Sequence, residues 1–295
     1  MKEFVCIDIG GTAIKAGILD ENGNIIEQSQ VATEAKKGGK YVLEKVKKII
    51  ERYINIREIK GVCISTTGMV DPIEGSIIYA NENMPDYKGI KLKKEIETAF
   101  GIPCEVENDV NCAGLAEYWN GAAKNSRNVF CLTVGTGIGG CAIVNGQLLR
   151  GNSYSACEIG YININGNHFE NLASTTALVQ NIANRKNMEI SDWDGKRILE
   201  YAEKGDRICL EAINEMADIL GLGIANICYI LNPEVVVLGG GIMQRESILT
   251  NMVRKSVENN LLHMIFSHTR LELAKYHNAA GMIGAWYYFQ KIHRS

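Results

Sequence analysis

Residues 4–31 read FVCIDIGGTAIKAGILDENGNIIEQSQV, and this stretch decides the fold class. Apolar residues run or alternate from Phe4 to Ile9 and from Ala13 to Leu19, with a Gly-Gly-Thr turn between them, and a third run extends from Ile25 to Val31. Runs of this length, bounded by glycine and asparagine, are typical of strands joined by tight turns. The stretch therefore predicts a three-stranded antiparallel meander.

The same pattern returns at residues 129–150, VFCLTVGTGIGGCAIVNGQLLR. Asn-Gly in this segment is a strong signal for a two-residue hairpin turn. Two copies of one strand pattern predict an internally duplicated α/β protein with two similar lobes. The order of the elements places the boundary near residue 120, which gives lobes of residues 1–120 and 121–295. The elements expected in the second copy are strand Val129 to Val134, turn Gly135 to Gly140, strand Cys141 to Val144, turn Asn145-Gly146 and strand Gln147 to Arg150.

Further segments predict the helices and parallel strands of the two lobes. Apolar residues share one helical face in residues 41–54, and a long amphipathic helix over residues 207–231 is ended by an Asn-Pro pair. The short apolar runs Gly61 to Ser65 and Val235 to Leu238 are typical of buried parallel strands. The last helix is expected from about Ala279 to Ile292, packing back on the N-terminal lobe.

Composition and charge exclude several classes of protein. The formal net charge of -3 over 295 residues gives no basic field that would drive binding to nucleic acid. No apolar stretch reaches membrane-spanning length and the first ten residues do not read as a signal peptide, so a cytoplasmic location without membrane attachment is expected. The nine cysteines form no C-x-x-C pair and lie mostly in apolar runs, which predicts reduced core residues.

Asp8-Ile-Gly-Gly-Thr12 is the first segment with a chemical signature. An acidic residue ends a buried strand, and two glycines let the backbone approach a phosphate group closely. Asp8 could hold a metal ion through water, and Thr12 could donate a hydrogen bond to a phosphate oxygen. A plain glycine hairpin is the alternative interpretation of this segment alone.

Two more glycine segments follow. Residues 133–140, TVGTGIGG, satisfy the dinucleotide pattern G-x-G-x-x-G, but that pattern requires a helix next and a hairpin follows here. We therefore interpret this segment as a phosphate-binding loop. Leu238-Gly-Gly-Gly-Ile242 lies where a strand meets a helix, and three glycines there allow a base or a ribose to approach the backbone.

The segment Val106-Glu-Asn-Asp-Val-Asn111 precedes a helix expected from Asn111 to Ala122 and carries the best candidate for a general base. The carboxylate of Asp109 could take a proton from a hydroxyl group while Asn108 binds a neighbouring hydroxyl. A helix N-cap is the alternative, because Asn and Asp are common caps. The sequence contains neither the Walker A pattern nor a kinase H-R-D loop, which excludes the two commonest designs for phosphate transfer.

Taken together, these motifs resemble the ROK family of sugar kinases and repressors. The resemblance covers nearly the whole chain and implies the actin-like (ribonuclease H-like) α/β fold, in which two duplicated lobes enclose a central cleft for ATP and sugar. It also implies ATP and Mg²⁺ as cofactors, with the magnesium carried by ATP near Asp8, and a homodimer. The matching segments are DIGGT at 8–12, STTGMVDP at 65–72, ENDVNCAGLAE at 107–117, LTVGTGIGG at 132–140, CEIGY at 157–161 and LNPEVVVLGGGI at 231–242.

Residue by residue, the resemblance makes Asp109 the general base and Asn108 a sugar ligand. Gly68 and Asn83 lie where the family contacts the sugar, and Glu158 matches the sugar-binding glutamate of the family's G-E-I-G-H segment. The nucleotide residues implied by the resemblance are Asp8, Gly10, Gly11, Thr12, Lys15, Thr133, Gly135, Thr136, Gly137, Gly139, Gly239, Gly240 and Gly241.

The sequence departs from the family at its zinc-binding segment. Most members continue G-E-I-G-H with C-x-C-G-x-x-G-C-x-E, whose cysteines bind zinc together with the histidine. Here Tyr161 replaces the histidine and no cysteine lies between Cys157 and Cys209, so no structural zinc is expected. Aligning ASTTAL with the family's A-S-G-T-A-L places Glu170 on the second sugar-binding glutamate. Burial is expected to hold the segment instead, through Tyr161, Ile162, Ile164 and Leu172.

Two other functions were weighed against the kinase. A repressor of this family carries a helix-turn-helix domain before DIGGT, whereas only seven residues precede Asp8 here. A sugar-binding module without catalysis would not need Asp109 beside intact phosphate loops. The sugar itself stays open, because family members act on glucose, N-acetylmannosamine, N-acetylglucosamine, fructose, allose and β-glucosides. N-acetylmannosamine is the first expectation, with β-glucosides and glucose as alternatives, and the 6-hydroxyl as the expected acceptor.

Overall fold

The computed structural model describes residues 2–80 and 82–293, and these form two compact units. The first unit contains the described residues of the ranges 1–120, 150–156 and 278–295. The second contains residues 121–149 and 157–277. Residues 150–156, which the sequence assigned to the second lobe, therefore belong to the first unit.

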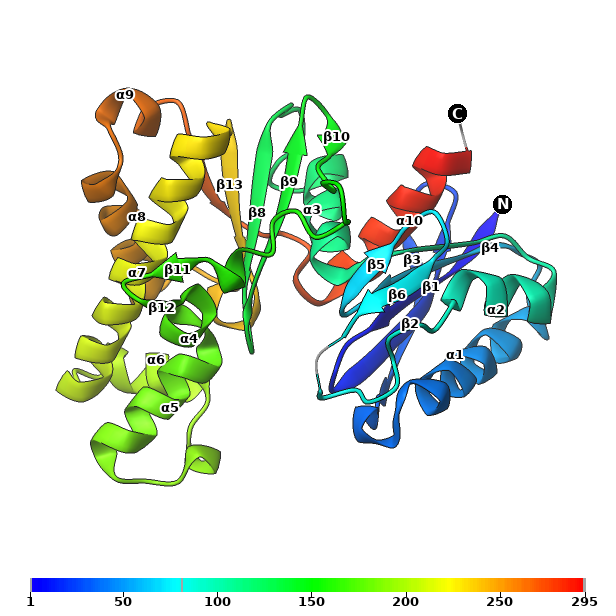
Figure 1. Ribbon diagram of the computed structural model, residues 1–295, viewed down its shortest axis with the longest axis horizontal. Coiled ribbons are helices and arrows are strands. Elements are labelled where there is room, and N and C mark those ends of the chain that lie inside the picture. Colours follow the sequence, from blue (N-terminus) through cyan, green and yellow to red (C-terminus); the bar gives the residue numbers. More distant parts are fainter. Residues whose placement is uncertain (1, 81, 294–295) are drawn as a thin grey trace. The chain divides into compact units, whose positions relative to one another are not determined.

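The first unit is built on a five-stranded sheet with the order β3-β2-β1-β4-β7 (Figure 1). β1, β2 and β3 pair antiparallel, which confirms the meander expected from the opening stretch. β4 and β7 run parallel to β1 on its other side. The strands are β1 (Glu3–Ile9), β2 (Ala13–Asp20), β3 (Ile25–Ala32), β4 (Ile59–Thr66) and β7 (Cys104–Asn108), with a separate hairpin of β5 (Met69–Asp71) and β6 (Ser76–Tyr79).

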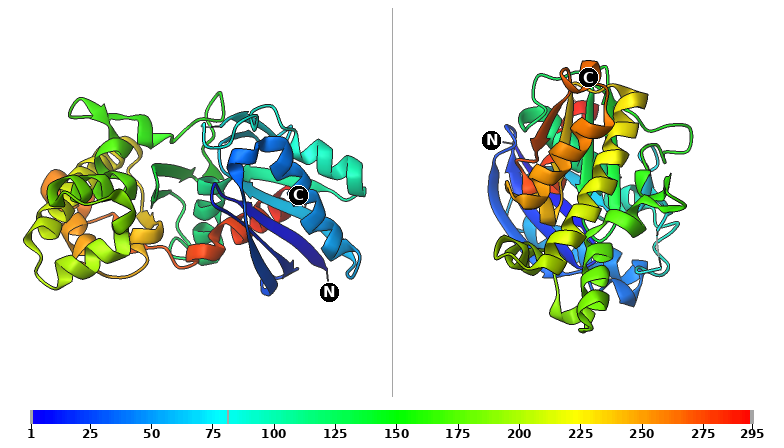
Figure 2. Two further views of the ribbon diagram at one scale, coloured as in Figure 1. Left: turned by 90° about the horizontal axis from the view of Figure 1, so that it is seen from below. Right: turned by 90° about the vertical axis from the view of Figure 1, so that its left-hand side faces the viewer.

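Helices cover both faces of this sheet (Figures 1 and 2). On one face, Ile7 and Ile9 of β1 share a buried core with Val46 of α1. Alternation along β1 turns Phe4 to the other face, where its ring lies 5.5 Å from that of Phe289 in α10. The last helix thus packs within the first unit. The helices are α1 (Gly39–Ile54), α2 (Leu92–Phe100), α3 (Asp109–Asn120) and α10 (Ala280–His293).

The second unit repeats the topology of the first. Its sheet has the order β10-β9-β8-β13-β14, with an antiparallel meander followed by two parallel strands, as in the first unit. This repeat confirms the internal duplication inferred from the two strand patterns. The strands are β8 (Val129–Val134), β9 (Ile138–Val144), β10 (Gln147–Leu148), β13 (Val235–Gly239) and β14 (Arg270–Leu273).

Two details of the second meander differ from the expectation. β9 begins at Ile138, so the glycine turn comprises only Gly135 to Gly137, and Gly139 already pairs with Thr133 in the sheet. β10 is two residues long, because the chain leaves the sheet after Leu148. The Asn145-Gly146 turn is confirmed: both residues have positive φ, 52° and 78°, as a two-residue hairpin of type I′ requires.

The long helix α7 (Arg207–Leu231) organises the core of the second unit. It has the bounds that the sequence predicts, and its apolar residues form one buried cluster with those of α4, α5, α6 and α8. The remaining elements are α4 (Phe169–Ala173), α5 (Thr175–Lys186), α6 (Gly195–Glu203), α8 (Ile248–Asn260), α9 (His263–Phe266), the hairpin of β11 (Asn163–Ile164) and β12 (Asn167–His168), and the 3₁₀ turns η1 (Ala35–Lys37), η2 (Ile159–Tyr161), η3 (Ile190–Asp192), η4 (Gly241–Met243) and η5 (His277–Ala279).

The cysteines behave as the sequence predicts. All nine are free thiols, eight of them buried and Cys157 half-buried. Burial raises the pKa of the Cys157 thiol to about 11, so it is a poor nucleophile near neutral pH.

None of the helices in residues 2–80 and 82–293 is long and apolar enough to cross a bilayer.

Close packing of α10 on α3 yields a test of the first unit. A Cβ atom at Gly284 would lie 1.7 Å from the carbonyl oxygen of Cys112 in α3. Gly284→Val should therefore lower the free energy of unfolding by about 3 kcal/mol, since a crowded core cannot accommodate the added carbons. Urea denaturation followed by circular dichroism measures the change.

Ile292→Ala on the same helix is the matched control, because that side chain is 46% exposed and should change the stability by about 0.5 kcal/mol or less. Equal stabilities of the Gly284 variant and the wild type would show that α10 does not approach α3 this closely.

Candidate active site

The candidate base lies at the junction of β7 and α3 in the first unit. α3 begins at Asp109 and ends at Asn120, two residues earlier at each end than expected. Oδ1 of Asn108 accepts hydrogen bonds from the backbone N–H groups of Val110 and Asn111, at 2.9 and 3.0 Å. The helix cap is therefore Asn108, which leaves Asp109 as the first helical residue, where the helix dipole favours a negative charge.

Asn108 also ties Asp109 to Gly68. Its amide nitrogen Nδ2 donates to the carbonyl oxygen of Gly68 at 2.9 Å and to Oδ1 of Asp109 at 3.0 Å. Gly68 has φ of +92°, and a Cβ atom there would lie 2.6 Å from the carbonyl oxygen of Tyr79, so no other residue is accommodated at this turn. The structure thus brings Gly68, Asn108 and Asp109 together, all of them at least partly accessible to solvent.

A buried carboxylate beneath this junction was not assigned a role by the sequence. Glu107 is 1% exposed, and its Oε1 accepts hydrogen bonds from the backbone N–H of Asn108 and from Nδ2 of Asn111. Its Oε2 accepts from the guanidinium group of Arg150 at 2.8 and 3.1 Å. An ionised group this deeply buried is stable only with such partners, so Glu107 fixes the junction that carries Asp109. Its place beside the candidate base in the sequence was the available signal.

The expected sugar residue Asn83 is exposed in the loop between β6 and α2. This loop is anchored by Tyr87, whose fully buried hydroxyl lies 2.7 Å from Oγ1 of Thr66. Burial raises the pKa of Tyr87, and the nearby charge of Asp109 acts in the same direction. The anchor of the Asn83 loop and the candidate base are therefore neighbours in the first unit.

The first phosphate segment forms the turn between β1 and β2. Gly10 N–H donates to the carbonyl oxygen of Ala13 at 3.0 Å, and Gly11 and Thr12 are exposed at its tip. Asp8 accepts a hydrogen bond from Ser65 at 2.7 Å, and Nζ of Lys15 lies 3.6 Å from its other oxygen. A carboxylate held at the end of β1 by these two side chains has oxygen atoms suited to a hydrated cation.

In the second unit the phosphate loop and the candidate sugar glutamates meet. Gly135 N–H donates to the carbonyl oxygen of Gly137 at 2.9 Å, which closes the turn between β8 and β9. A Cβ atom at Gly137 would lie 2.5 Å from Oε2 of Glu170, so this carboxylate lies against the loop. Burial, and next the charge of Glu170, raise the pKa of Glu158, which places the two glutamates close together.

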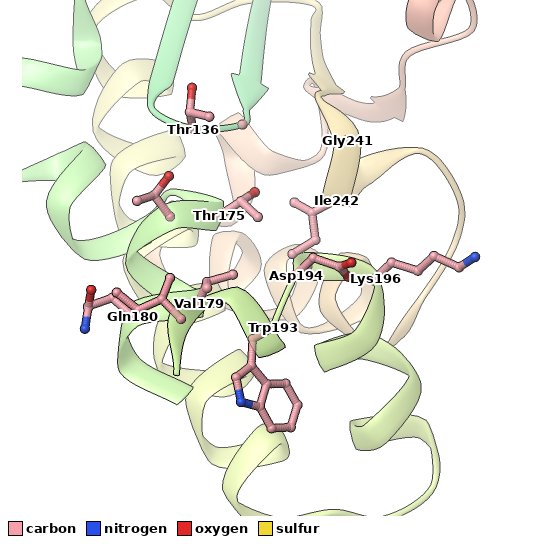
Figure 3. A pocket seen from close by; sticks show the side chains of 13 residues that line it. Thr136, Thr175, Val179, Gln180, Trp193, Asp194, Lys196, Gly241 and Ile242 are labelled. Atoms are coloured by element: carbon pink, nitrogen blue, oxygen red, sulfur yellow. The ribbon is translucent and has the colours of Figure 1, made fainter. Parts of the chain in front are cut away.

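A cavity of about 540 Å³ opens beside this loop, wholly within the second unit (Figure 3). Thr136 and Gly241 lie at one end, and Gln180 and Trp193 at the other. Of the expected nucleotide residues, Gly135, Thr136 and Gly241 line it, whereas Gly240 packs tightly on β8, where a Cβ atom would lie 2.0 Å from the carbonyl oxygen of Val134. The other lining residues are Thr175, Thr176, Val179, Gln180, Ile190, Trp193, Asp194, Gly195, Lys196 and Ile242.

The sequence missed the wall formed by residues 175–196. Ser174 caps α5 and Asp194 caps α6, and both helix starts lie at the cavity or next to it. The hydroxyl of Thr175 is buried and has no hydrogen-bond partner within the described part of the chain. A cavity with mainly apolar walls and a few polar groups is the ordinary form of a site for a flat, partly polar ligand.

The segment that replaces the family's zinc site is held differently from the expectation. Tyr161 is 44% exposed, and its ring meets that of His168 edge-on at a centroid distance of 5.7 Å, so its burial was wrongly expected. The side chain of Ile164 is only 4% exposed, and Phe169 is fully buried against α7. Ile162 and Leu172 are partly buried against the same core. Residues 2–80 and 82–293 contain no cluster of three or more histidine, cysteine, aspartate or glutamate side chains arranged to hold a metal ion.

Sequence comparisons identify relatives over the full length of the chain. The ROK family model matches residues 4–292. An uncharacterized protein of Clostridium perfringens is 49% identical over 98% of both chains. A β-glucoside kinase of Listeria innocua is 30% identical over 97% of both chains.

Two solved structures superpose on nearly the whole chain. A glucokinase of Streptomyces griseus, crystallised with glucose and AMPPNP, superposes with a TM-score of 0.84 at 28% identity, covering 96% of this chain and 97% of that one. A Listeria monocytogenes protein suggested to be an N-acetylmannosamine kinase gives 0.88 at 27% identity, covering 99% and 100%. The duplicated actin-like α/β fold is thereby confirmed. Since the family model spans residues 4–292 and a relative 49% identical covers 98% of the sequence, the chain belongs to the ROK family.

Proposed function

We propose that the protein is a kinase that transfers the γ-phosphate of ATP to a hydroxyl group of a small sugar, with Asp109 as the general base. The observation that carries this proposal is the junction of β7 and α3, where Asn108 caps the helix and hydrogen-bonds the carboxylate of Asp109. A half-buried carboxylate that is oriented in this way and still accessible is suited to accept the proton of a bound hydroxyl.

The chemistry requires few groups. As Asp109 accepts the proton, the hydroxyl oxygen forms a bond to the γ-phosphorus, the bond from this phosphorus to the bridging oxygen breaks, and ADP leaves with that electron pair. Most of the catalysis then comes from positioning and from neutralisation of phosphate charge. Glu107 acts on this step only indirectly, by fixing the start of α3.

ATP is proposed to bind in the cavity of the second unit. Its volume of about 540 Å³ lies within the range of small-molecule pockets. The adenosine would lie between Gly241 and the wall of α5 and α6, and the phosphates would meet the backbone of Gly135 and Thr136. The Thr175 hydroxyl, buried in that wall, could donate to the nucleotide.

The remaining expected nucleotide residues divide between direct and supporting roles. In the first unit Gly10 closes the turn through its own N–H, the exposed residues Gly11 and Thr12 would present theirs to a phosphate, and Lys15 lies beside Asp8. In the second unit Thr133 pairs with Gly139 and Gly239 near the ends of the strands from which the loop arises. Gly240 packs against Val134 of β8. Mg²⁺, which would neutralise the phosphate charge, is proposed to arrive with ATP and to be held through water near Asp8.

The sugar is proposed to contact Gly68, Asn83 and Asn108 of the first unit and Glu158 and Glu170 of the second. Among sugars we favour N-acetylmannosamine, because of the structural similarity to the Listeria monocytogenes protein, with the 6-hydroxyl as acceptor. A β-glucoside is the second candidate, because a β-glucoside kinase is 30% identical over 97% of its length. A coupled assay of ADP release over a panel of N-acetylmannosamine, N-acetylglucosamine, glucose, fructose, allose and cellobiose decides between them.

We also propose that the enzyme is cytoplasmic and homodimeric. Nine free thiols suit a reducing compartment. Four apolar side chains of the second unit, Tyr229, Ile230, Leu262 and Met264, are between 48% and 80% exposed near the ends of α7 and α8, and they offer a surface for a second copy. Light scattering at micromolar concentration gives the mass that tests the dimer.

Asp109→Asn tests the general base. This change keeps the size of the side chain but removes its ability to take a proton, so kcat should fall by about a hundredfold or more while the KM of the sugar changes little. The measurement is steady-state kinetics with the best sugar of the panel. Turnover equal to that of the wild type would remove Asp109 from the mechanism.

Asp206→Asn is the matched control for this variant. Asp206 also stands at the start of a helix, where it caps α7 and pairs with Lys186, but it neither lines the cavity nor belongs to the proposed sugar contacts. Because Asn caps a helix about as well as Asp, the change removes mainly the ion pair with Lys186, so it should lower the stability by about 1 kcal/mol or less and leave kcat unchanged.

Removal of zinc tests the departure from the family's metal site. With Mg²⁺ supplied, the enzyme should keep its activity after prolonged treatment with a zinc-selective chelator, because Ile164 and Phe169 secure the segment by burial. Elemental analysis of tag-free protein is the accompanying measurement. Stoichiometric zinc that is lost together with activity would contradict the prediction.

A further inference from the structure

The carboxylate of Glu170 packs against two glycines of the second unit. A Cβ atom at Gly137, in the phosphate loop, would lie 2.5 Å from its Oε2, and one at Gly160 would lie 3.1 Å from the same oxygen. Real Cβ atoms essentially never come as close as the first of these distances, so Gly137 must lack a side chain for the carboxylate to lie where it does.

A second connection joins the same two segments. The backbone N–H of Thr175 donates to the carbonyl oxygen of Gly135 at 2.9 Å, and Ser174 N–H donates to the carbonyl oxygen of Glu170 at 3.0 Å. The short stretch from Glu170 to Thr175 therefore touches the phosphate loop twice, once at each end of its three-residue turn.

This stretch is itself firmly held. Phe169, the residue before Glu170, is fully buried, and its ring lies so close to α7 that a Cβ atom at Gly223 would approach it to 2.4 Å. A loop tip of glycines has little rigidity of its own, whereas α4 and α7 belong to the main core of the unit. The core thus holds Glu170 in place, and the carboxylate of Glu170 in turn holds the phosphate loop.

We infer that Glu170 positions the nucleotide phosphate loop, and that a sugar hydroxyl bound to this carboxylate steadies the loop for ATP. The inference rests on the proposed function and adds to it a coupling between the two substrates within one unit. A ligand on Glu170 limits the movement of the carboxylate against Gly137, so the second substrate finds the loop already ordered. By reciprocity, a bound nucleotide must raise the affinity for the sugar by the same factor.

The first experiment needs no sugar. Calorimetry measures the Kd of Mg²⁺–AMPPNP for the wild type, Glu170→Ala and Glu170→Gln. The alanine variant removes the support of the loop and should weaken binding by about fivefold or more, the lower end of usual couplings. The glutamine variant keeps the shape of the side chain and should remain within about twofold of the wild type. Equal Kd values for all three proteins would overturn the inference and leave Glu170 as a sugar contact alone.

The second experiment compares Gly137→Ala with a control variant in the same assay, with and without saturating N-acetylmannosamine, or with the best sugar of the panel if N-acetylmannosamine gives no heat. Gly137→Ala displaces the carboxylate and should abolish the gain in AMPPNP affinity that the sugar produces in the wild type. Asn171→Ala is the control, because this exposed side chain follows Glu170 on α4 and is not a proposed ligand contact, and it should retain the gain.

A double variant separates positioning from simple misfolding. Glu170→Asp shortens the side chain by one methylene group, and in the Gly137→Ala background it should restore part of the lost coupling. Failure of this rescue, with both variants folded by thermal denaturation, would overturn the inference. A wild type that binds AMPPNP but no sugar of the panel would overturn the proposed function together with the coupling, and one without AMPPNP binding would remove the nucleotide site itself.

Discussion

The hydrogen-bonded carboxylate of Glu107 is the constraint on which the proposed catalytic junction of β7 and α3 depends. A charge that is 1% exposed is unfavourable unless its partners are complete, and here three different residues supply donors to its two oxygens. One of them is the backbone of Asn108, so the end of β7 cannot shift without breaking a bond to a buried charge. Asp109 is the next residue in the chain, so its backbone is held in place as well.

Glycines allow other segments of the two units to pack closely, because they have no side chain. α10 approaches α3 because Gly284 adds nothing between them, and the glycine segment after β13 fits against Val134 because Gly240 has no Cβ atom. In the phosphate loop the same absence at Gly137 admits the carboxylate of Glu170. Gly137 and Gly240, which the sequence suggested as nucleotide contacts, thus also allow close packing of one segment on another.

The sequence predicted those features that depend on local patterns. Strand alternation, continuous apolar runs and the Asn-Gly turn gave both meanders, the parallel strands β4 and β13 and the bounds of α7. The pair Asn108-Asp109 was open to two interpretations, as a helix cap or as a catalytic site, and the structure makes Asn108 the cap.

Features that depend on residues distant in sequence were not predictable in the same way. Arg150 lies 43 residues from Glu107, and no periodicity links them. The cavity proposed for the nucleotide is lined largely by residues between 175 and 196, whose helical pattern says nothing about which face lines a cavity. Tyr161 was expected to be buried because a lost metal site suggested a compensating core, but the hairpin of β11 and β12 and the buried Phe169 already secure that segment.

Phosphorus NMR directly observes the proposed transfer of phosphate from ATP to a sugar. The protein is mixed with ATP, Mg²⁺ and N-acetylmannosamine, glucose or cellobiose in turn, and the spectra are followed over time. We expect that one of these sugars yields a phosphate monoester resonance that grows in step with ADP. Intact ATP with every sugar of the panel, or ADP accompanied only by inorganic phosphate, would contradict it.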